Sequence, residues 1–475
     1  MARDLRSFLT QYEASHPELV LRLRKEIRAN QEVTALVMKL EKEEKYPVVI
    51  AENILTCSGN KSSFPLITNL LASRSRCAEA IGSTFRTVHL DFYKMSRQSP
   101  LQPQVLSRAE APVKQVVKVG RDVDLTQSPA LYHHYMDPGP YFTAGFLTTY
   151  DPDSGIDNCA LQRGWIYDKR TVRFYPYTVS HNWLNLRKNR DRGQPTRLAY
   201  WVGHHPATCV AAQSRLGYPQ SHFAAMGGVL GEALRVVPSE TLGDDFLVPA
   251  DAEVVVEGVV KSYDQYPEGP FGEYGGYIGP QVPNPQFEVT AITHRKDAYW
   301  HDILVGHPDN QVMGGFGIEG AVYEVVKKRF PSLKNVYMPL SGTCRFHVYL
   351  QFENPPAGHA REAMMLALIQ DLRTKHAFAF DEDVDIFNER EVLWAIATRS
   401  QWDKDVMIFP GTRGDNLDPS NTGLGEGASG CIDCTKPWGK PFEEVVNVDK
   451  EVYDRVQLEE YIPSDKLYKI PQERM

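Results

Sequence analysis

The chain has 475 residues, of which 42% are hydrophobic and 24% are charged, and its formal net charge at pH 7 is −8. This length predicts about two or three domains, and the acidic balance gives no electrostatic reason to expect a nucleic-acid partner. No apolar run is long enough for a membrane span, and the first residues lack the apolar core of a secretory signal, so we expect a cytoplasmic protein. Its seven cysteines should then be reduced thiols.

The first segment, residues 1–110, is expected to be helical or α+β. Apolar residues recur on one helical face among charged ones, which predicts helices over residues 4–45. Residues 47–51 have the composition of a buried strand, and a helix is expected around 66–71.

Residues 111–315 have a different pattern, in which short β-branched runs alternate with Gly- and Pro-containing turns. Many short strands with this punctuation predict a barrel or a sandwich, packed against a helix over 222–234. The predicted strands are 113–119, 141–150, 198–203, 253–260 and 287–293.

A linker helix is predicted over residues 316–330, because basic residues occupy its last turn and Pro331 ends it. Beyond it, strands over 345–352 and 384–387 alternate with helices over 360–373 and 389–398. This alternation predicts a smaller α/β domain over 331–445, followed by a charged tail over 446–475.

Two details of that smaller domain are predicted from local sequence. Asn388 should cap the last helix, with Glu391 closing a capping box. After Pro410 the chain should be a Gly-rich loop. Cys431 and Cys434 lack a second pair at zinc-site spacing, so ordinary thiols are expected there.

The strongest candidates for chemistry are Arg163, Glu268 and Glu273. The two glutamates lie five residues apart in a loop, 266–277, that is too rich in Gly and Pro for a helix or a regular strand. Such a stiff loop, which carries two acids among aromatic residues, suits a pocket where one acid holds a proton and the other pairs with a cation.

This pattern resembles the UbiD-type decarboxylases, which use prenylated flavin mononucleotide (prenylated FMN). The family signature is an E-G-P-[FY]-G-[ED] loop ending in G-Y, here Glu268 to Glu273 and then 276–277. It also includes an Asn five residues before an Arg, here Asn158 and Arg163. Further matching segments are 4–9, 46–53, 203–207, 231–232, 383–388 and 391–399.

The resemblance implies a mixed α+β and α/β fold. A flavin-reductase-like split β-barrel, which binds the cofactor, would be joined by the linker helix to the smaller α/β domain. That domain would serve oligomerisation, in a homo-oligomer that is either a dimer or a hexamer.

The resemblance also implies roles for the three charged residues. Arg163 would hold the substrate carboxylate through its rigid fork. Glu273 would deliver a proton after CO2 departs. Glu268 would stay ionised against Arg163, because an adjacent cation favours the charged form of a carboxylate.

A cofactor is required because removing CO2 from an sp² carbon leaves a carbanion that no side chain can stabilise. The resemblance implies prenylated FMN, with its phosphate anchored by Mn²⁺ and K⁺. Asn158, His205 and Glu232 match the expected metal ligands, with His204 as the alternative to His205. Cys159 and Gln162, between Asn158 and Arg163, are expected to contact the cofactor.

The implied reaction is reversible, non-oxidative decarboxylation of an aromatic or heteroaromatic carboxylic acid. Two alternatives remain: an α,β-unsaturated (cinnamic-type) acid as substrate, or a non-catalytic subunit of a multi-subunit carboxylase. A flavin prenyltransferase would supply the cofactor, and no nucleic acid or membrane is expected as a partner. Residues 159–162 match neither of the better-known family patterns, which leaves the substrate open.

Three further features are left without a firm role. Residues 315–320 satisfy G-x-G-x-x-G, but they lack both a preceding strand and a following acid, so we expect a flexible lead into the linker helix. His307 either recognises a polar substituent or packs a loop. Lys436 lies in a segment that resembles the family, and it is assigned no function.

Overall fold

The computed structural model describes residues 3–177, 180–421 and 425–467. The chain forms two compact units, Met1–Thr435 and Lys436–Met475. The second unit contains three short helices, α12 (Lys450–Arg455), α13 (Leu458–Tyr461) and α14 (Ser464–Leu467). Among the described residues, no helix is both long and apolar enough to cross a bilayer.

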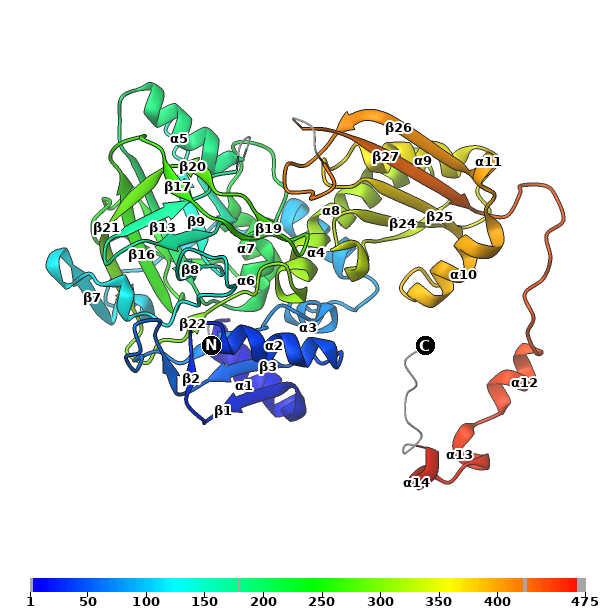
Figure 1. Cartoon of the computed structure of the whole chain (residues 1–475), viewed down its shortest axis with the longest axis horizontal. Coiled ribbons are helices and arrows are strands. Elements are labelled where there is room, and N and C mark those ends of the chain that lie inside the picture. The colour runs from blue at the N-terminus through cyan, green and yellow to red at the C-terminus, as the bar shows by residue number, and fades with distance from the viewer. Residues whose placement is uncertain (1–2, 178–179, 422–424, 468–475) are drawn as a thin grey trace. The chain divides into compact units, whose positions relative to one another are not determined.

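The first unit begins with a small α/β layer. Its sheet has the order β1-β3-β5-β22, so a strand from around residue 300 pairs with strands from the N-terminal segment (Figure 1). Asp4 caps the first helix by accepting a hydrogen bond from Ser7 N at 2.8 Å. The elements of this layer are α1 (Leu5–Ser15), β1 (Val20–Leu23), β2 (Ile27–Arg28), α2 (Glu32–Lys42), β3 (Val48–Ala51), β4 (Ile54–Leu55), β5 (Leu66–Thr68) and β22 (Trp300–His301).

The expected strand at 47–51 is confirmed, but two predictions for this layer are wrong. Residues 20–28, expected to continue a helix, contain β1 and β2, and the helix expected at 66–71 begins as β5. Residues 66–71 are a short, mainly apolar run, for which periodicity cannot distinguish a buried strand from a helix, whereas residues 20–28 mix apolar and charged side chains. β1 and β5 pair with β3 on its two sides, and this pairing makes both segments strands.

A curled nine-stranded sheet forms the barrel of the first unit, as predicted. Its order is β10-β9-β13-β16-β21-β12-β11-β8, with β7 added at β21. β13 and β16 pair along seven residues each, and their β-branched and aromatic side chains fill the interior. The strands are β7 (Val116–Val119), β8 (Tyr141–Phe142), β9 (Phe146–Tyr150), β10 (Asp157–Leu161), β11 (Gly164–Ile166), β12 (Thr171–Phe174), β13 (Thr196–Val202), β16 (Val254–Val260) and β21 (Gln286–His294).

Small sheets and helices complete the barrel side of the unit. β14 (Arg235–Pro238) pairs with β15 (Leu247–Pro249) and with β6 (Gln104–Val105). The helices are α3 (Arg74–Ala80), α4 (Val88–Gln98), α5 (His181–Asp191), α6 (Pro206–Ala211) and α7 (His222–Leu230).

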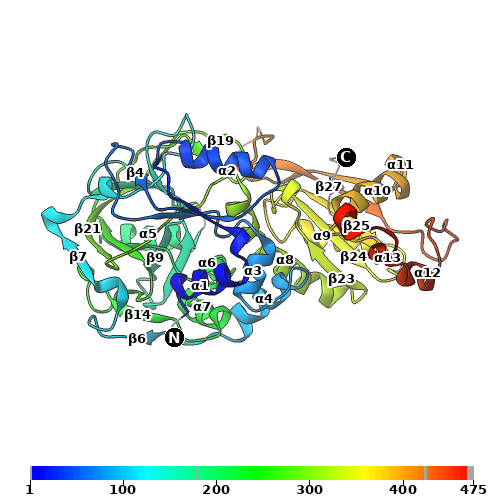
Figure 2. The ribbon, with the colours of Figure 1, turned by 90° about the horizontal axis from the view of Figure 1, so that it is seen from below.

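The linker helix is longer than predicted. α8 (Pro308–Arg329) begins before the predicted start at residue 316, and Figure 2 shows it with α3 and α4 between the barrel and the next sheet. The expected flexible lead at 315–320 is therefore wrong, since these residues lie inside the helix. The glycines permit close packing on α4: at Gly320 a Cβ would collide with the Tyr93 side chain and the His89 carbonyl.

A five-stranded sheet of order β23-β24-β25-β27-β26 forms the smaller α/β part. β24, β25 and β27 run parallel, while β23 and β26 are antiparallel edges. The elements are β23 (Leu333–Tyr337), β24 (His347–Phe352), α9 (His359–Leu368), β25 (His376–Asp381), α10 (Glu389–Arg399), α11 (Trp402–Asp405), β26 (Val406–Arg413) and β27 (Glu426–Cys434).

Three predictions for this part are corrected. The strand expected at 384–387 is a turn that follows β25, and the loop expected after Pro410 contains the end of β26 and all of β27. Glycines in β27 lower its strand propensity, yet it is held between β25 and β26. Asn388 caps α10 as predicted, but Glu391 accepts from Asp385 N at 2.9 Å instead of from the cap residue's backbone.

Candidate active site

The acidic loop is built from two small antiparallel ladders. β17 (Tyr266–Glu268) pairs with β20 (Val282–Asn284), and β18 (Phe271–Gly272) pairs with β19 (Ile278–Gly279). Between β17 and β18, Gly269 adopts a φ of +82°, a conformation that L side chains rarely take. The chain can therefore turn sharply between Glu268 and Glu273 and present both carboxylates to one partner.

That partner is Arg163, at the junction of β10 and β11. Its Nε and Nη2 donate to the two oxygens of Glu268 at 3.0 and 2.7 Å, and its Nη1 pairs with Glu273 Oε1. The guanidinium lies 4.9 Å from the ring of Tyr175 and 5.4 Å from that of Phe271. The structure thus brings the three predicted catalytic residues into one buried cluster.

The two glutamates have different surroundings. Besides Arg163, Glu268 accepts from Tyr141 Oη at 3.1 Å and from Asn284 Nδ2 at 3.2 Å, and it is fully buried. Glu273 has Arg163 as its side-chain partner. Burial raises the pKa of Glu273 to about 7, although Arg163 opposes that shift. A carboxyl group with this pKa can donate a proton near neutral pH.

A cavity of about 510 Å³ opens beside this cluster. Aromatic side chains of Tyr175, Tyr177, Phe271 and Tyr274 contribute to its wall, together with Arg163 and Glu273. This volume and lining suit a small organic ligand.

The segment from Asn158 to Arg163 lies in the wall of this cavity. Asn158, Cys159 and Gln162 line the cavity, and Gln162 donates to the Tyr175 carbonyl. A ligand in the cavity would therefore meet this whole segment.

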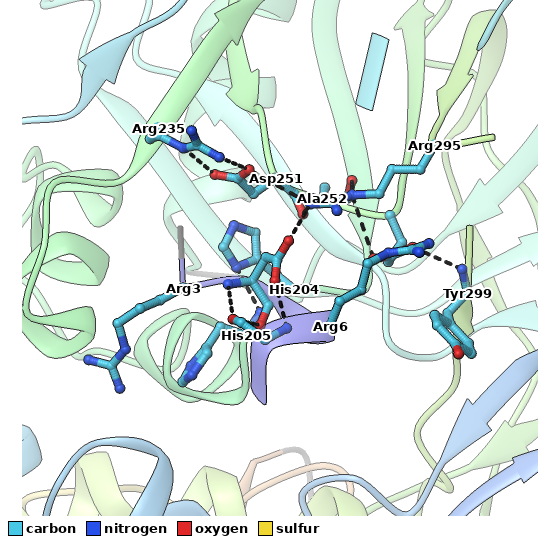
Figure 3. A network of polar contacts seen from close by, with 12 residues as sticks. Arg3, Arg6, His204, His205, Arg235, Asp251, Ala252, Arg295 and Tyr299 are labelled. Carbon is cyan, nitrogen blue, oxygen red and sulfur yellow. Dashed lines mark hydrogen bonds and ion pairs between the residues drawn. The ribbon is translucent and has the colours of Figure 1, made fainter. Parts of the chain in front are cut away.

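His205 and Glu232, by contrast, are not among the described residues that line this cavity. His205 Nδ1 accepts from Ala207 N at 3.1 Å as the cap of α6, and Glu232 accepts from Arg3 N at 2.9 Å. Figure 3 shows His204 and His205 beside Arg3 and Arg6, in a polar network around α1. The structure therefore does not bring the predicted metal triad together at this cavity, since only Asn158 lies in its wall.

Two histidines that were not predicted from the sequence line the cavity with Asn158. His181 and His222 begin α5 and α7, each directly after a serine that caps its helix, and their ring centroids are 6.3 Å apart. In the sequence, the local feature that these two histidines share is a preceding serine. This feature is a weak indication of a site, because Ser15 also precedes His16. Their proximity is a tertiary feature.

The remaining sequence features lie elsewhere. His307 Nδ1 pairs with Glu41 at 2.6 Å, and its ring stacks on His134. Lys436 belongs to the second unit. Cys431 and Cys434 are buried free thiols, and in the described part of the chain no three His, Cys, Asp or Glu side chains form a metal cluster.

Comparison with known proteins identifies the class. Three sequence profiles of 3-octaprenyl-4-hydroxybenzoate carboxy-lyase match consecutive segments: the N-terminal domain at residues 15–91, the Rift-related domain at 104–308 and the C-terminal domain at 311–434. These are the domains of UbiD. The fold and the site therefore define a carboxy-lyase, and the chain belongs to the UbiD family.

Individual relatives agree with this. The chain is 30% identical over 406 residues to the anhydromevalonate phosphate decarboxylase of Methanosarcina mazei, covering 84% of this chain and 90% of that protein. It is similar to the UbiD-class enzyme HmfF of Pelotomaculum thermopropionicum in complex with FMN, with 30% identity, a TM-score of 0.89, and coverage of 97% and 100% of the two chains. An evolved dimeric form of HmfF in complex with prFMN gives 29% identity and a TM-score of 0.86, again with 97% and 100% coverage.

Proposed function

We propose that this chain catalyses the reversible, non-oxidative decarboxylation of an aromatic or heteroaromatic carboxylic acid with prenylated FMN. The observation that carries the proposal is a largely buried glutamate with a near-neutral pKa, Glu273, held beside Arg163 at the wall of a cavity that several aromatic side chains line. A scaffold subunit has no use for such a pair, which argues against the non-catalytic alternative. Homo-oligomer formation is part of the proposal.

The proposed roles follow from the chemistry of each group. Arg163 binds the substrate carboxylate, and Glu268 holds the guanidinium in place through two hydrogen bonds. When bound, prenylated FMN supplies the electron sink that loss of CO2 requires. Glu273 then gives its proton to the carbon that carried the carboxylate.

A second candidate substrate is a phosphorylated, non-aromatic acid. It is favoured by the relative from Methanosarcina mazei, which is named an anhydromevalonate phosphate decarboxylase. The test is a panel of benzoic, furoic and cinnamic acids and a phosphorylated unsaturated acid, with CO2 release measured for each. The proposal expects turnover among the aromatic acids. Turnover confined to the phosphorylated acid would contradict the aromatic assignment.

For the cofactor phosphate and its metal, we propose Asn158, His181 and His222 as the ligands. His222 Nε2 lies 3.3 Å from the Ser214 carbonyl, while its Nδ1 is buried without a hydrogen-bond partner. An Nε2–H bond to that carbonyl fixes the tautomer in which Nδ1 has a lone pair for a metal. Burial lowers the pKa of His181, and it lowers that of His222 to about 4, so both rings stay neutral.

The third proposed ligand and the metal itself fit this set. Asn158 Nδ2 donates to Asn182 Oδ1 at 2.6 Å, which leaves the Asn158 oxygen available. Two neutral imidazoles and an amide oxygen suit Mn²⁺. We also propose that K⁺ would bind together with Mn²⁺ at the phosphate of the cofactor.

His222→Asn is expected to weaken metal binding roughly 10²-fold or more and to lose bound flavin with the metal. Glu232→Gln and His205→Asn are the matched controls and should retain both. The measurement is metal analysis together with flavin absorbance of each purified protein. If His222→Asn retains both metal and flavin while Glu232→Gln loses them, the metal ligands are instead Asn158, His205 and Glu232.

The pH dependence is expected to follow Glu273. Because burial raises its pKa to about 7, the proton-donating acid form predominates below that pH and is lost above it. For decarboxylation, kcat/KM should therefore fall about tenfold per pH unit above about pH 7. A profile that stays flat up to pH 9 would contradict Glu273 as the donor.

A further inference from the structure

Arg345 is a buried cation in the wall of the same cavity. It lies just before β24, and only 5% of the residue is exposed. Its Nη1 donates to the carbonyls of Gln311 and Cys344 at 2.9 and 3.2 Å, while its Nε is buried without a partner. The guanidinium lies 5.5 Å from the ring centre of Tyr274, the residue after Glu273.

Within the part of the chain that the structure describes, no carboxylate forms an ion pair with Arg345, although Asp371 is close enough to act on its charge. Arg215 and Arg373 share the carboxylate of Asp371, at 2.6 and 2.8 Å, but no acidic oxygen lies within 4.0 Å of Arg345. Asp415 also lies in the cavity wall, and its carboxylate accepts hydrogen bonds from the hydroxyls of Tyr274 and Tyr177.

A buried charge without a counterion is costly, because desolvation is not offset by an ion pair. Burial accordingly lowers the pKa of Arg345. The sequence nevertheless accommodates the guanidinium, since the glycine at position 314 of α8 leaves the space that it occupies. The Arg345 guanidinium, in the cavity wall and without an ion pair to any described residue, is placed for a ligand that brings its own negative charge.

We propose that Arg345 forms a subsite for a second anionic group on the substrate, apart from the carboxylate that Arg163 binds. The substrate class is then a dicarboxylate or a phosphorylated carboxylate. This inference rests on the proposed function, because it assumes that Arg163 and Glu273 mark the reacting end of the cavity. The other possible anion is the cofactor phosphate, for which Asn158, His181 and His222 provide a separate set of ligands.

The test compares binding of terephthalate, which has two carboxylates, with benzoate, which has one. The wild-type holoenzyme should bind terephthalate roughly tenfold or more tightly than benzoate, the scale of a charge-assisted hydrogen bond. Arg345→Met should abolish that preference and leave the Kd of benzoate unchanged. Arg345→Lys should keep part of it, and Arg413→Met, at an exposed neighbouring cation, should keep all of it.

Thermal stability and flavin content of the same variant distinguish a substrate subsite from a cofactor contact or a structural brace. Arg345→Met should have a Tm equal to or above the wild type, because it removes an uncompensated charge, and an unchanged flavin content. Lost flavin would assign the guanidinium to the cofactor phosphate, and a large fall in Tm would make it a structural brace. Either result overturns the inference. It is also overturned if the wild type binds terephthalate and benzoate with equal affinity, or binds neither.

Because binding is measured without turnover, failure of the subsite is distinguishable from failure of the reaction. The terephthalate preference can be present in a protein that decarboxylates no acid of the panel, and then only the reaction is refuted. Turnover without the preference refutes only the subsite.

Discussion

Glu273→Gln is expected to lower kcat by about a hundredfold or more while KM stays close to the wild-type value. Glutamine keeps the shape of the side chain and its contact with Arg163, but it has no proton to give. Substrate should therefore bind and react, and the step that quenches the carbanion should fail. In the wild type, turnover in D2O should place deuterium at the carbon that lost CO2.

Glu268→Gln is the matched control for this experiment. It changes the same chemical group in the same loop, but at the residue that holds Arg163. It should impair binding as well as kcat. If Glu268→Gln is inactive and Glu273→Gln retains near wild-type turnover, the two roles are reversed. If both variants stay active, neither acid takes part in the reaction.

Arg163→Met is expected to raise KM and lower kcat together, with a combined loss in kcat/KM of about 10²-fold or more. The substrate carboxylate loses its anchor, and Glu268 is left buried without its ion pair. Removing one partner of a buried pair costs about 3 kcal/mol or more of stability, so Tm should also fall.

Arg163→Lys provides the comparison for that variant. It keeps a positive charge but not the planar fork that donates to both oxygens of Glu268. We expect a stability between the wild type and Arg163→Met, with KM still raised. A wild-type KM in Arg163→Met would remove this residue from substrate binding.

The cluster of Arg163, Glu268 and Glu273 could be predicted because most of its information is local. A Gly/Pro-rich loop with two acids five residues apart is visible in the sequence, and its match to a family motif links it to Arg163. The structure adds what the motif does not contain: which acid has several hydrogen-bond donors, and which has a raised pKa.

The proposed metal ligands could not be found in this way. His181 and His222 lie 41 positions apart and begin different helices, so only the packing of α5 and α7 brings them together at the cavity. His205 lies in a segment that matches the family, yet its ring nitrogen caps α6. The sequence around a histidine gives no indication of which role its ring nitrogen takes.

Errors in secondary structure have a similar origin. β5 and β27 are short or glycine-containing segments whose strand conformation depends on neighbouring strands. The early start of α8 depends on glycines that permit close contact with Arg345 and Tyr93. In each case tertiary packing overrides local propensity.

The most direct test of the central claim is decarboxylation by protein produced with and without a flavin prenyltransferase in the same host. We expect turnover only after co-expression, with mass spectrometry of the released cofactor showing a prenylated flavin. Protein made in a host that lacks the prenyltransferase should bind plain FMN, or no flavin, and be inactive. Equal turnover from both preparations would contradict a decarboxylation that depends on prenylated FMN.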